Sequence, residues 1–232
     1  MLEITWLGHS SFQFKLPSGE ILLVDPWTGN PKYPEGHQIT RADAILVSHG
    51  HFDHIASVVE LAVKHGSKVV SNYEICMYLK SRGVANIAPM NKGGSQEVCG
   101  VKAVMTHALH SSGIEDSNGA MIYGGEASGF VLRFSDGRAL YFAGDTAVFG
   151  DMALIGQIYR PGLAILPIGD LFTMGPEEAA HACRMIGAAR VIPMHWGTFP
   201  PLTGRPEHLA HGIRELSGTQ VWTLTPGQAV VW

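Results

Sequence analysis

One stretch constrains the fold more than any other: an apolar run that changes abruptly into a turn rich in metal-ligand side chains. Residues 45–47 have the character of a buried strand, and the six residues from His49 to His54 then supply three histidines and an aspartate. A helical pattern follows over residues 55–65. The chain is therefore expected to form a strand-to-helix turn at which four ligand-type side chains gather.

The spacing within this turn predicts two metal ions rather than one. Imidazole nitrogens and a carboxylate are ligands that zinc, iron and manganese accept. His49 and His51 are two positions apart on extended chain and can face one ion, whereas Asp53 and His54 lie just past the bend and can reach a second. A polar surface loop is the alternative interpretation, but four ligand-type residues in six positions disfavour it.

The order of the remaining segments predicts an α/β fold. Two groups of short strand patterns are each followed by alternating strands and helices, which favours two mixed sheets with helices on their outer faces, an αββα sandwich. Strands are expected at 4–7, 12–16, 21–24, 42–47, 68–71, 96–99, 101–106, 129–134, 139–143, 163–166, 190–193, 220–224 and 228–232, and helices at 55–65, 74–81, 148–159, 176–186 and 206–216. No linker is long enough to separate two units, so we expect one domain over residues 1–232, with loops 28–40 and 111–126 walling a pocket.

The composition of the chain narrows the classes of molecule that it is expected to bind. The formal net charge is -4 and no Lys/Arg cluster can follow a phosphate backbone, which disfavours nucleic acid. The three cysteines are scattered, with no CxxC pair, and no apolar stretch is long enough to span a bilayer. Met1 runs directly into a strand pattern without an export signal. We expect a cytoplasmic protein that acts on a small molecule and does not bind membranes. The sequence leaves open whether the chain forms a homo-oligomer.

Three later strand ends offer further ligands. His107 and His110 both follow the strand at 101–106 and compete for one position, and spacing alone does not choose between them. Asp145 follows an apolar strand through Gly144, which allows a close backbone approach, although an aspartate capping a helix is the alternative. His195 ends a short buried strand, where a packed core histidine is the alternative.

These motifs carry a resemblance to a known family. His49-Gly50-His51-Phe52-Asp53-His54 resembles the HxHxDH signature of the metallo-β-lactamase superfamily, and Gly144-Asp145-Thr146 and His195 follow in the superfamily's order. Trp6-Leu7-Gly8-His9-Ser10 and His110-Ser111 resemble one branch, the ascorbate-6-phosphate lactonases and the small metal-dependent hydrolases related to them. The resemblance spans nearly the whole chain.

The resemblance implies a metallo-β-lactamase fold and a complete ligand set. It places His49, His51 and His110 on one ion, Asp53, His54 and His195 on the other, and Asp145 between them. His107 is then a packed or supporting histidine. These nitrogen and oxygen donors suit zinc, manganese or iron, and no cysteine lies in the motifs to offer a thiolate. Zinc is expected, with manganese or iron as alternatives.

Three more residues are candidates for supporting roles. The resemblance suggests His9 as a substrate contact or proton donor, with a turn histidine bonded to backbone as the alternative. Asp25, at the end of the third strand, is placed to orient a ligating imidazole. Asp170, after another strand-end glycine, is a similar candidate, and an Asx-turn is the competing interpretation.

Hydrolysis is the reaction that such a site is expected to perform. Two ions about 3.5–4 Å apart lower the pKa of a shared water enough to hold hydroxide near neutral pH. Hydroxide attacks an ester, lactone or phosphodiester, while Asp53 accepts or returns a proton. A lactonase- or esterase-like hydrolase of a small metabolite is the leading hypothesis. An iron-dependent redox or oxygen enzyme on the same ligands, and a non-catalytic metabolite-binding protein, are the alternatives.

Overall fold

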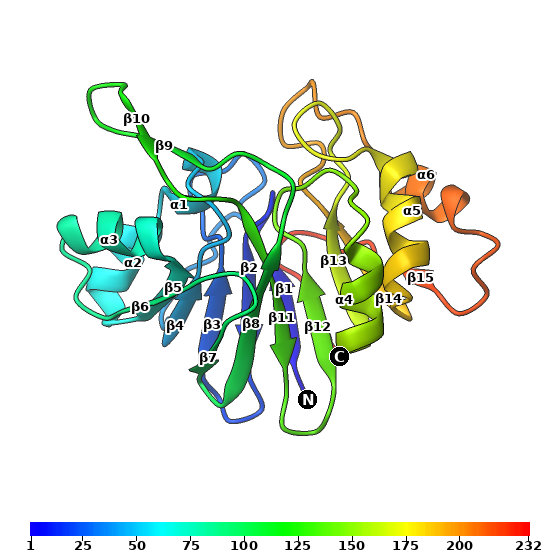
Figure 1. Cartoon of the computed structure of the whole chain (residues 1–232), viewed down its shortest axis with the longest axis horizontal. Helices are drawn as coiled ribbons and strands as arrows, with labels where there is room; N and C mark the ends of the chain where they lie inside the picture. The colour runs from blue at the N-terminus through cyan, green and yellow to red at the C-terminus, as the bar shows by residue number, and fades with distance from the viewer.

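Two seven-stranded mixed sheets pack face to face, with helices on their outer sides, in a computed structural model that describes all residues 1–232 (Figure 1). The first sheet has the order β16 (Ala229–Val231), β1 (Glu3–Trp6), β2 (Phe12–Lys15), β3 (Ile21–Val24), β4 (Ala44–Leu46), β5 (Lys68–Asn72), β6 (Ile87–Met90). The second has the order β15 (Gln220–Val221), β14 (Arg190–Met194), β13 (Leu163–Pro167), β12 (Ala139–Phe142), β11 (Ser128–Arg133), β8 (Val101–His107), β7 (Ser95–Val98). The expected αββα sandwich is confirmed.

Side chains along each strand point alternately to the two faces of its sheet. One face packs against the other sheet, and the outer face packs against helices. Leu22 and Val24 of β3 face the second sheet, whereas Leu23 packs under helices α2 (Val58–His65) and α3 (Tyr73–Ser81). In the second sheet, Phe142 points inward and Tyr141 packs under α4 (Met152–Tyr159), α5 (Pro176–Ile186) and α6 (Pro206–Gly212). The sheets therefore enclose one apolar layer and carry a further one on each outer side.

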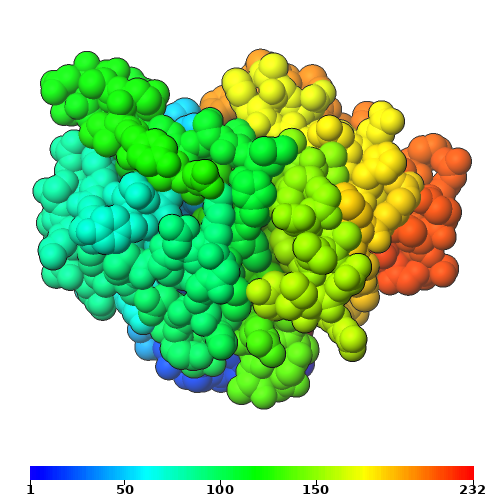
Figure 2. Space-filling view, in the orientation of Figure 1, coloured from blue at the N-terminus to red at the C-terminus, as the bar shows by residue number.

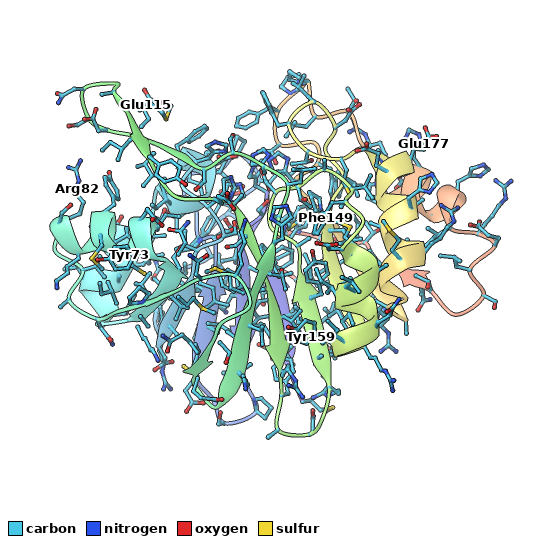
Figure 3. The ribbon with its side chains drawn as sticks, viewed as in Figure 1. Tyr73, Arg82, Glu115, Phe149, Tyr159 and Glu177 are labelled. Carbon is cyan, nitrogen blue, oxygen red and sulfur yellow. The ribbon has the colours of Figure 1, made fainter.

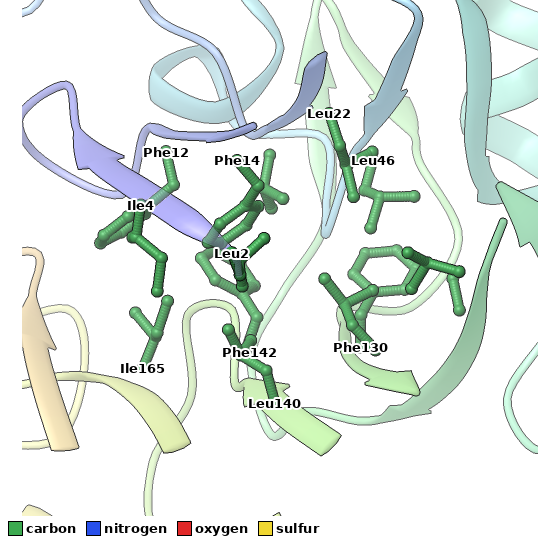
Figure 4. Packing of buried hydrophobic residues seen from close by; sticks show 14 of the residues in the cluster. Leu2, Ile4, Phe12, Phe14, Leu22, Leu46, Phe130, Leu140, Phe142 and Ile165 are labelled. Atoms are coloured by element: carbon green, nitrogen blue, oxygen red, sulfur yellow. The ribbon is translucent and has the colours of Figure 1, made fainter. Parts of the chain in front are cut away.

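The layer between the sheets is the largest core cluster. It holds 25 buried residues drawn from both sheets, among them Phe14 on β2, Phe130 on β11 and Phe142 on β12 (Figure 4). Phe12 meets Phe142 edge-on, with ring centroids 6.0 Å apart, so aromatic contacts link the two halves of the chain. This packing fixes how the edges of the two sheets face each other.

The topology brings the ends of several strands to one edge. Strands β3 to β6 are mutually parallel, and so are β12 to β15. Strands β1 and β8 run in the same direction as these, because each is separated from them by one antiparallel neighbour. The loops after β1, β3, β4, β8, β12 and β14 therefore leave from the upper edge in Figure 1, where every candidate ligand is found.

The structure differs from the sequence-based expectation in several segments. Strand β6 was not expected, α4 begins at Met152 inside the expected range 148–159, and α6 ends at Gly212 inside the expected range 206–216. The helix expected over 55–65 begins only at Val58, as α2, and a separate one-turn helix, α1 (Phe52–Ile55), precedes it. Between them, the hydroxyl of Ser57 accepts the backbone N–H of Thr28. The expected loop 111–126 contains a hairpin, β9 (Gly113–Glu115) and β10 (Met121–Tyr123), which stands away from the body of the protein (Figure 2). Its strands have three residues each and its Met121 and Tyr123 are exposed, so no apolar alternation marks it.

None of the helices is long or apolar enough to cross a membrane. The three cysteines are all unpaired.

The cysteine environments predict unequal reactivity. Burial raises the pKa of Cys76 to about 11 and that of Cys183 to about 12. Burial also raises the pKa of Cys99, but this thiol lies at a partly exposed turn that a reagent can reach. At pH 8 a thiol of pKa 11 is only about one part in a thousand thiolate, and the thiolate is the reactive form. We expect a thiol reagent to modify one cysteine in the native protein and all three in guanidinium. The C99S variant should lose the native reaction, and three equally fast thiols would contradict this assignment.

Candidate metal centre

Three histidines from both sheets form the first candidate cation group. His49 follows β4, His51 precedes α1, and His110 lies in the loop after β8. His51 Nδ1 lies 3.0 Å from His49 Nε2 and 3.2 Å from His110 Nε2. These separations are close to the edge of about 3.3 Å expected for a tetrahedron with zinc–nitrogen bonds of 2.0–2.1 Å. Burial lowers the pKa of His49 well below its ordinary value, so its ring is neutral and able to act as a ligand.

The second candidate group combines a carboxylate with buried histidines. Asp53 Oδ2 lies 3.7 Å from His54 Nε2 and 3.8 Å from His195 Nε2, and His9 completes the group. Asp53 and His54 come from α1, and His195 comes from the end of β14 in the other sheet. This group also draws its members from both halves of the chain.

Asp145 lies between the two groups. Its Oδ2 is 3.0 Å from His195 Nε2, 3.3 Å from His54 Nε2 and 3.9 Å from His110 Nε2. Gly144 permits this position, since its φ is +66° and a Cβ there would meet the carbonyl oxygen of Ser128 at 2.5 Å. The sequence interpretation of Gly144 as the residue that allows a close approach agrees with this geometry.

Asp25 supports histidines of both groups. It is fully buried, and its Oδ2 accepts His54 Nδ1 at 2.8 Å and the Ser48 hydroxyl. Its Oδ1 accepts the backbone N–H of Ser48 at 2.7 Å. The Ser48 hydroxyl in turn lies 3.0 Å from His49 Nδ1. One carboxylate thus fixes the ring of His54 directly and that of His49 through Ser48, as expected of the residue behind a ligating imidazole.

The buried charges fit a bound cation. With Nδ1 of His54 committed to Asp25, its Nε2 has no hydrogen-bond partner and faces the Asp53 and Asp145 carboxylates. Burial alone would lower the pKa of His54, but the carboxylates of Asp145, Asp53 and Asp25 raise that pKa well above its ordinary value. Burial likewise opposes protonation of His195, yet Asp145 raises its pKa to about 9. The site therefore requires positive charge, which a metal ion supplies through the same lone pairs.

His9 is bonded to side chains and not to backbone. Its Nε2 lies 2.8 Å from Asp53 Oδ2 and its Nδ1 lies 2.9 Å from the hydroxyl of Thr198. Burial lowers the pKa of His9 to about 4, so the ring is neutral at pH 7. Because an ionised carboxylate only accepts, Nε2 carries the proton and donates to Asp53, and Nδ1 accepts from Thr198. The alternative of a ring bonded to backbone is wrong.

Two other candidates lie outside the centre. His107 packs edge-on against Phe149, and its Nδ1 lies 2.9 Å from Lys92 Nζ. Asp170 is exposed, and its carboxylate accepts the backbone N–H of Leu171. The structure thus places His110, and not His107, beside His51, and it leaves Asp170 in a turn.

Three of the seven non-glycine residues with a positive φ lie at the centre. His9, Asp25 and His195 have φ angles of 51°, 45° and 58°, in the left-handed region that non-glycine residues seldom occupy. Each such residue costs about 1–3 kcal/mol and persists where the surroundings hold it in place. Three of the residues that shape the centre are therefore held in strained conformations.

A cavity of about 310 Å³ opens onto the two groups. Its lining includes His9, Asp53, Asp145 and His195, and on the outer side five apolar residues: Phe52, Met121, Phe172, Phe199 and Leu202. The expectation that residues 111–126 wall the pocket is confirmed by Met121, whereas loop 28–40 supplies no lining residue and that expectation is wrong. The sequence interpretation missed the other four. Phe52 stands within the HxHxDH motif and offered a signal, whereas Phe172, Phe199 and Leu202 come from loops whose approach to the cavity no spacing reveals.

The comparisons with known proteins give the family. The β-lactamase superfamily domain model matches residues 21–196. The chain belongs to the metallo-β-lactamase superfamily. Among its superfamily relatives, a UPF0173 metal-dependent hydrolase of Solibacter usitatus is 60% identical over 232 residues, which is 100% of each chain. A UPF0173 metal-dependent hydrolase of Rubrobacter xylanophilus is 50% identical over 97% of this chain and 95% of its own.

A solved structure of a metallo hydrolase is also similar to this chain. Igni18, a metallo hydrolase from the hyperthermophilic archaeon Ignicoccus hospitalis, superposes with a TM-score of 0.86 at 31% identity, over 99% of this chain and 97% of its own. The family membership that the HxHxDH motif indicated is thereby confirmed.

Proposed function

We propose that this protein is a metal-dependent hydrolase that cleaves an ester, lactone or phosphodiester of a small metabolite at a centre of two cations. The observation that carries the proposal is the position of Asp145 Oδ2, which faces His110 of one group and both His54 and His195 of the other. The metal-dependent hydrolases among the relatives support the reaction class.

The proposed ligands follow the two groups. His49, His51 and His110 would hold one cation, Asp53, His54 and His195 the second, and Asp145 would bridge them. We propose zinc, with manganese or iron as alternatives, because the donors are imidazoles and carboxylates without a thiolate. When bound, such a pair of cations supplies Lewis acidity and lowers the pKa of water.

Asp53 is proposed as the residue that handles the proton, and His9 as the residue that positions it. The Asp53 carboxylate is anionic because its pKa is held well below the ordinary value: burial opposes this, but His54, His195 and His9 outweigh burial. It lines the cavity, where it can accept a proton from water and return it to a leaving group. Both ring nitrogens of His9 are bonded, so we assign it to orienting Asp53 rather than to direct proton donation.

The location and partner are also proposals. Three unpaired cysteines suit a reducing compartment, so we place the protein in the cytoplasm. A cavity of about 310 Å³ suits a small molecule as substrate.

The test is a reconstitution followed by a substrate screen. The apoprotein is loaded with zinc, manganese or iron, its metal content is measured, and esters, lactones and phosphodiesters are offered. Two ions per chain and turnover of one of these classes are expected. No turnover of any class in the fully loaded protein would favour a non-catalytic binding role. Oxygen uptake confined to the iron form would favour the redox alternative.

The two competing histidines provide a matched pair of variants. H110A removes a proposed ligand, so we expect its metal content to fall below two ions and its kcat/KM to fall by at least about 100-fold, because a cation contributes several kcal/mol to the transition state. H107A removes a ring that contacts Lys92 and Phe149, so its activity should stay within about 3-fold. Elemental analysis and initial rates measure both. A larger loss in H107A would reverse the assignment.

A further inference from the structure

The cavity over the candidate centre is lined by no lysine or arginine. The chain has 16 lysines and arginines, yet none of them lines the cavity. Its charged lining residues besides histidine are Asp53, Asp145 and Glu115, all acidic. A phosphate or carboxylate group distant from the reacting bond needs Arg, Lys or converging N–H donors in place of its water shell. The cavity offers no arginine or lysine for such a group.

The outer part of the cavity is instead apolar and exposed. Phe52, Met121 and Phe172 line it with 55%, 68% and 62% of their surface exposed, and they come from three separate segments. Large apolar side chains left in water around a functional cavity mark the place where an apolar ligand is bound. The substrate would cover these side chains.

The five apolar lining residues form an apolar wall, and two of its aromatic residues pack against Trp27. The ring of Trp27 meets Phe52 edge-on at 5.4 Å between centroids and packs against Phe199 at 6.1 Å. His9, which holds Asp53, contacts both Trp27 and Phe199. The apolar wall and the proton-handling carboxylate are thus parts of one packed cluster, which orders the wall before a ligand arrives.

The opposite side of the cavity is formed by the projecting hairpin of β9 and β10. Met121 and Glu115 both belong to it, and Figure 3 shows Glu115 out on this hairpin. A Cβ on Gly113 would meet the Met121 sulfur at 2.5 Å, so glycine there makes room for the methionine side chain. Met121 is flexible and polarisable and adapts to apolar chains of different shape.

We propose that the substrate is a carboxylic ester or lactone whose remaining part is an uncharged, apolar chain, and not a phosphorylated or otherwise anionic metabolite. This inference rests on the proposed hydrolase function and narrows its substrate class. Water adds to the acyl carbon, the bond from that carbon to the alcohol oxygen breaks, and the proton lost by water passes to the leaving oxygen. The products are a carboxylic acid and an alcohol, or a hydroxy acid from a lactone.

Two esters of equal chain length separate charge from size. The zinc-loaded protein is given p-nitrophenyl butyrate and the p-nitrophenyl monoester of succinic acid, which differ in one terminal carboxylate. We expect kcat/KM to be at least about 30-fold higher for the butyrate, and higher still for the octanoate, whose chain reaches the apolar wall. Equal rates or a preference for the succinate would overturn the inference. Absence of turnover with all three, while phosphodiesters are cleaved, would overturn it and leave the hydrolase intact.

Neighbouring residues supply matched variants for the wall. Phe172 lines the cavity and Leu171, equally exposed at 60%, does not. F172K should lower kcat/KM for the octanoate about 10-fold and raise it for the succinate monoester, whereas L171K should leave both within about 2-fold. Met121 and Tyr123 form a second pair on the hairpin, with M121A affecting the octanoate and Y123A not. Equal effects within either pair would overturn the proposed wall.

A binding measurement tests the proposed apolar wall independently of the proposed hydrolase function. Octanamide carries the same apolar chain without an ester bond, and its binding to the zinc-loaded protein is followed by calorimetry. Binding that weakens about 10-fold in F172K and is unchanged in L171K supports the apolar wall. The same binding without turnover of any ester would count against the hydrolase and not against the wall. No binding to any variant would overturn the inference.

Discussion

The D145A variant is expected to lose at least a thousandfold in kcat/KM and to bind fewer than two metal ions. Asp145 Oδ2 is the one oxygen within 4 Å of His110, His54 and His195 together, so its removal takes away the proposed bridge between the cations. It also removes the carboxylate that contributes most to the raised pKa values of His54 and His195. A thousandfold fall in kcat/KM corresponds to the loss of several kcal/mol of transition-state stabilisation.

The measurements are initial rates, elemental analysis and the far-ultraviolet circular dichroism spectrum. The matched control is D151A, which removes an exposed aspartate six residues later whose side chain caps no helix, and it should retain full activity. An active D145A variant that still holds two ions would rule out the bridge. A variant that loses its spectrum would be replaced by D145N, which keeps the size and hydrogen-bonding capacity of the side chain but not its charge.

The D25A variant is expected to lose stability and the affinity for both cations at once. Asp25 accepts hydrogen bonds from His54, the Ser48 hydroxyl and the Ser48 backbone, and all of these groups are buried. Removal of one member of such a buried charged network costs about 3–5 kcal/mol. Loss of the residue that orients a ligating histidine lowers metal affinity about 10–100-fold.

Chemical denaturation and metal titration test this pair of effects. D25N serves as the intermediate variant, because asparagine tolerates the left-handed backbone at φ 45° and keeps one acceptor. D136A, at an exposed hairpin turn, is the control for a general loss of negative charge. A D25A protein that unfolds at the wild-type denaturant concentration would exclude the supporting role. Weakened binding of only one cation would exclude the link through Ser48 to His49.

The turn from His49 to His54 could be predicted from sequence because its information is local. Ligand residues two to five positions apart at a strand end approach one another in any fold that has this strand and helix. The choice between His107 and His110 is different: His107 still belongs to β8, and the chain must leave the strand before His110 reaches His51. Only the resemblance to the superfamily indicated this, because the length of a strand is not set by local spacing.

The features that sequence did not predict depend on contacts between distant segments. Thr198 bonds to His9 across 189 positions, and no pattern in either segment signals it. The wall residues Met121 and Phe172 lie in exposed segments, where alternation carries no information because neither face is buried. At the break between α1 and α2, Ser57 accepts the backbone N–H of Thr28, a contact between distant segments that the local helix pattern does not reveal.

Both groups proposed to hold a cation include side chains from both sheets. His110 and His195 come from the second sheet, while their partners in each group come from the turn and the short helix after β4. Bound cations would then link the two sheets at the upper rim of the sandwich, whereas most of the remaining interface is apolar packing with a few hydrogen bonds, such as that from Ser128 to the Ser48 carbonyl. Chelation would release that rim first, and the two sheets would separate from the active-site side, so that loss of metal and loosening of the fold begin at the same place.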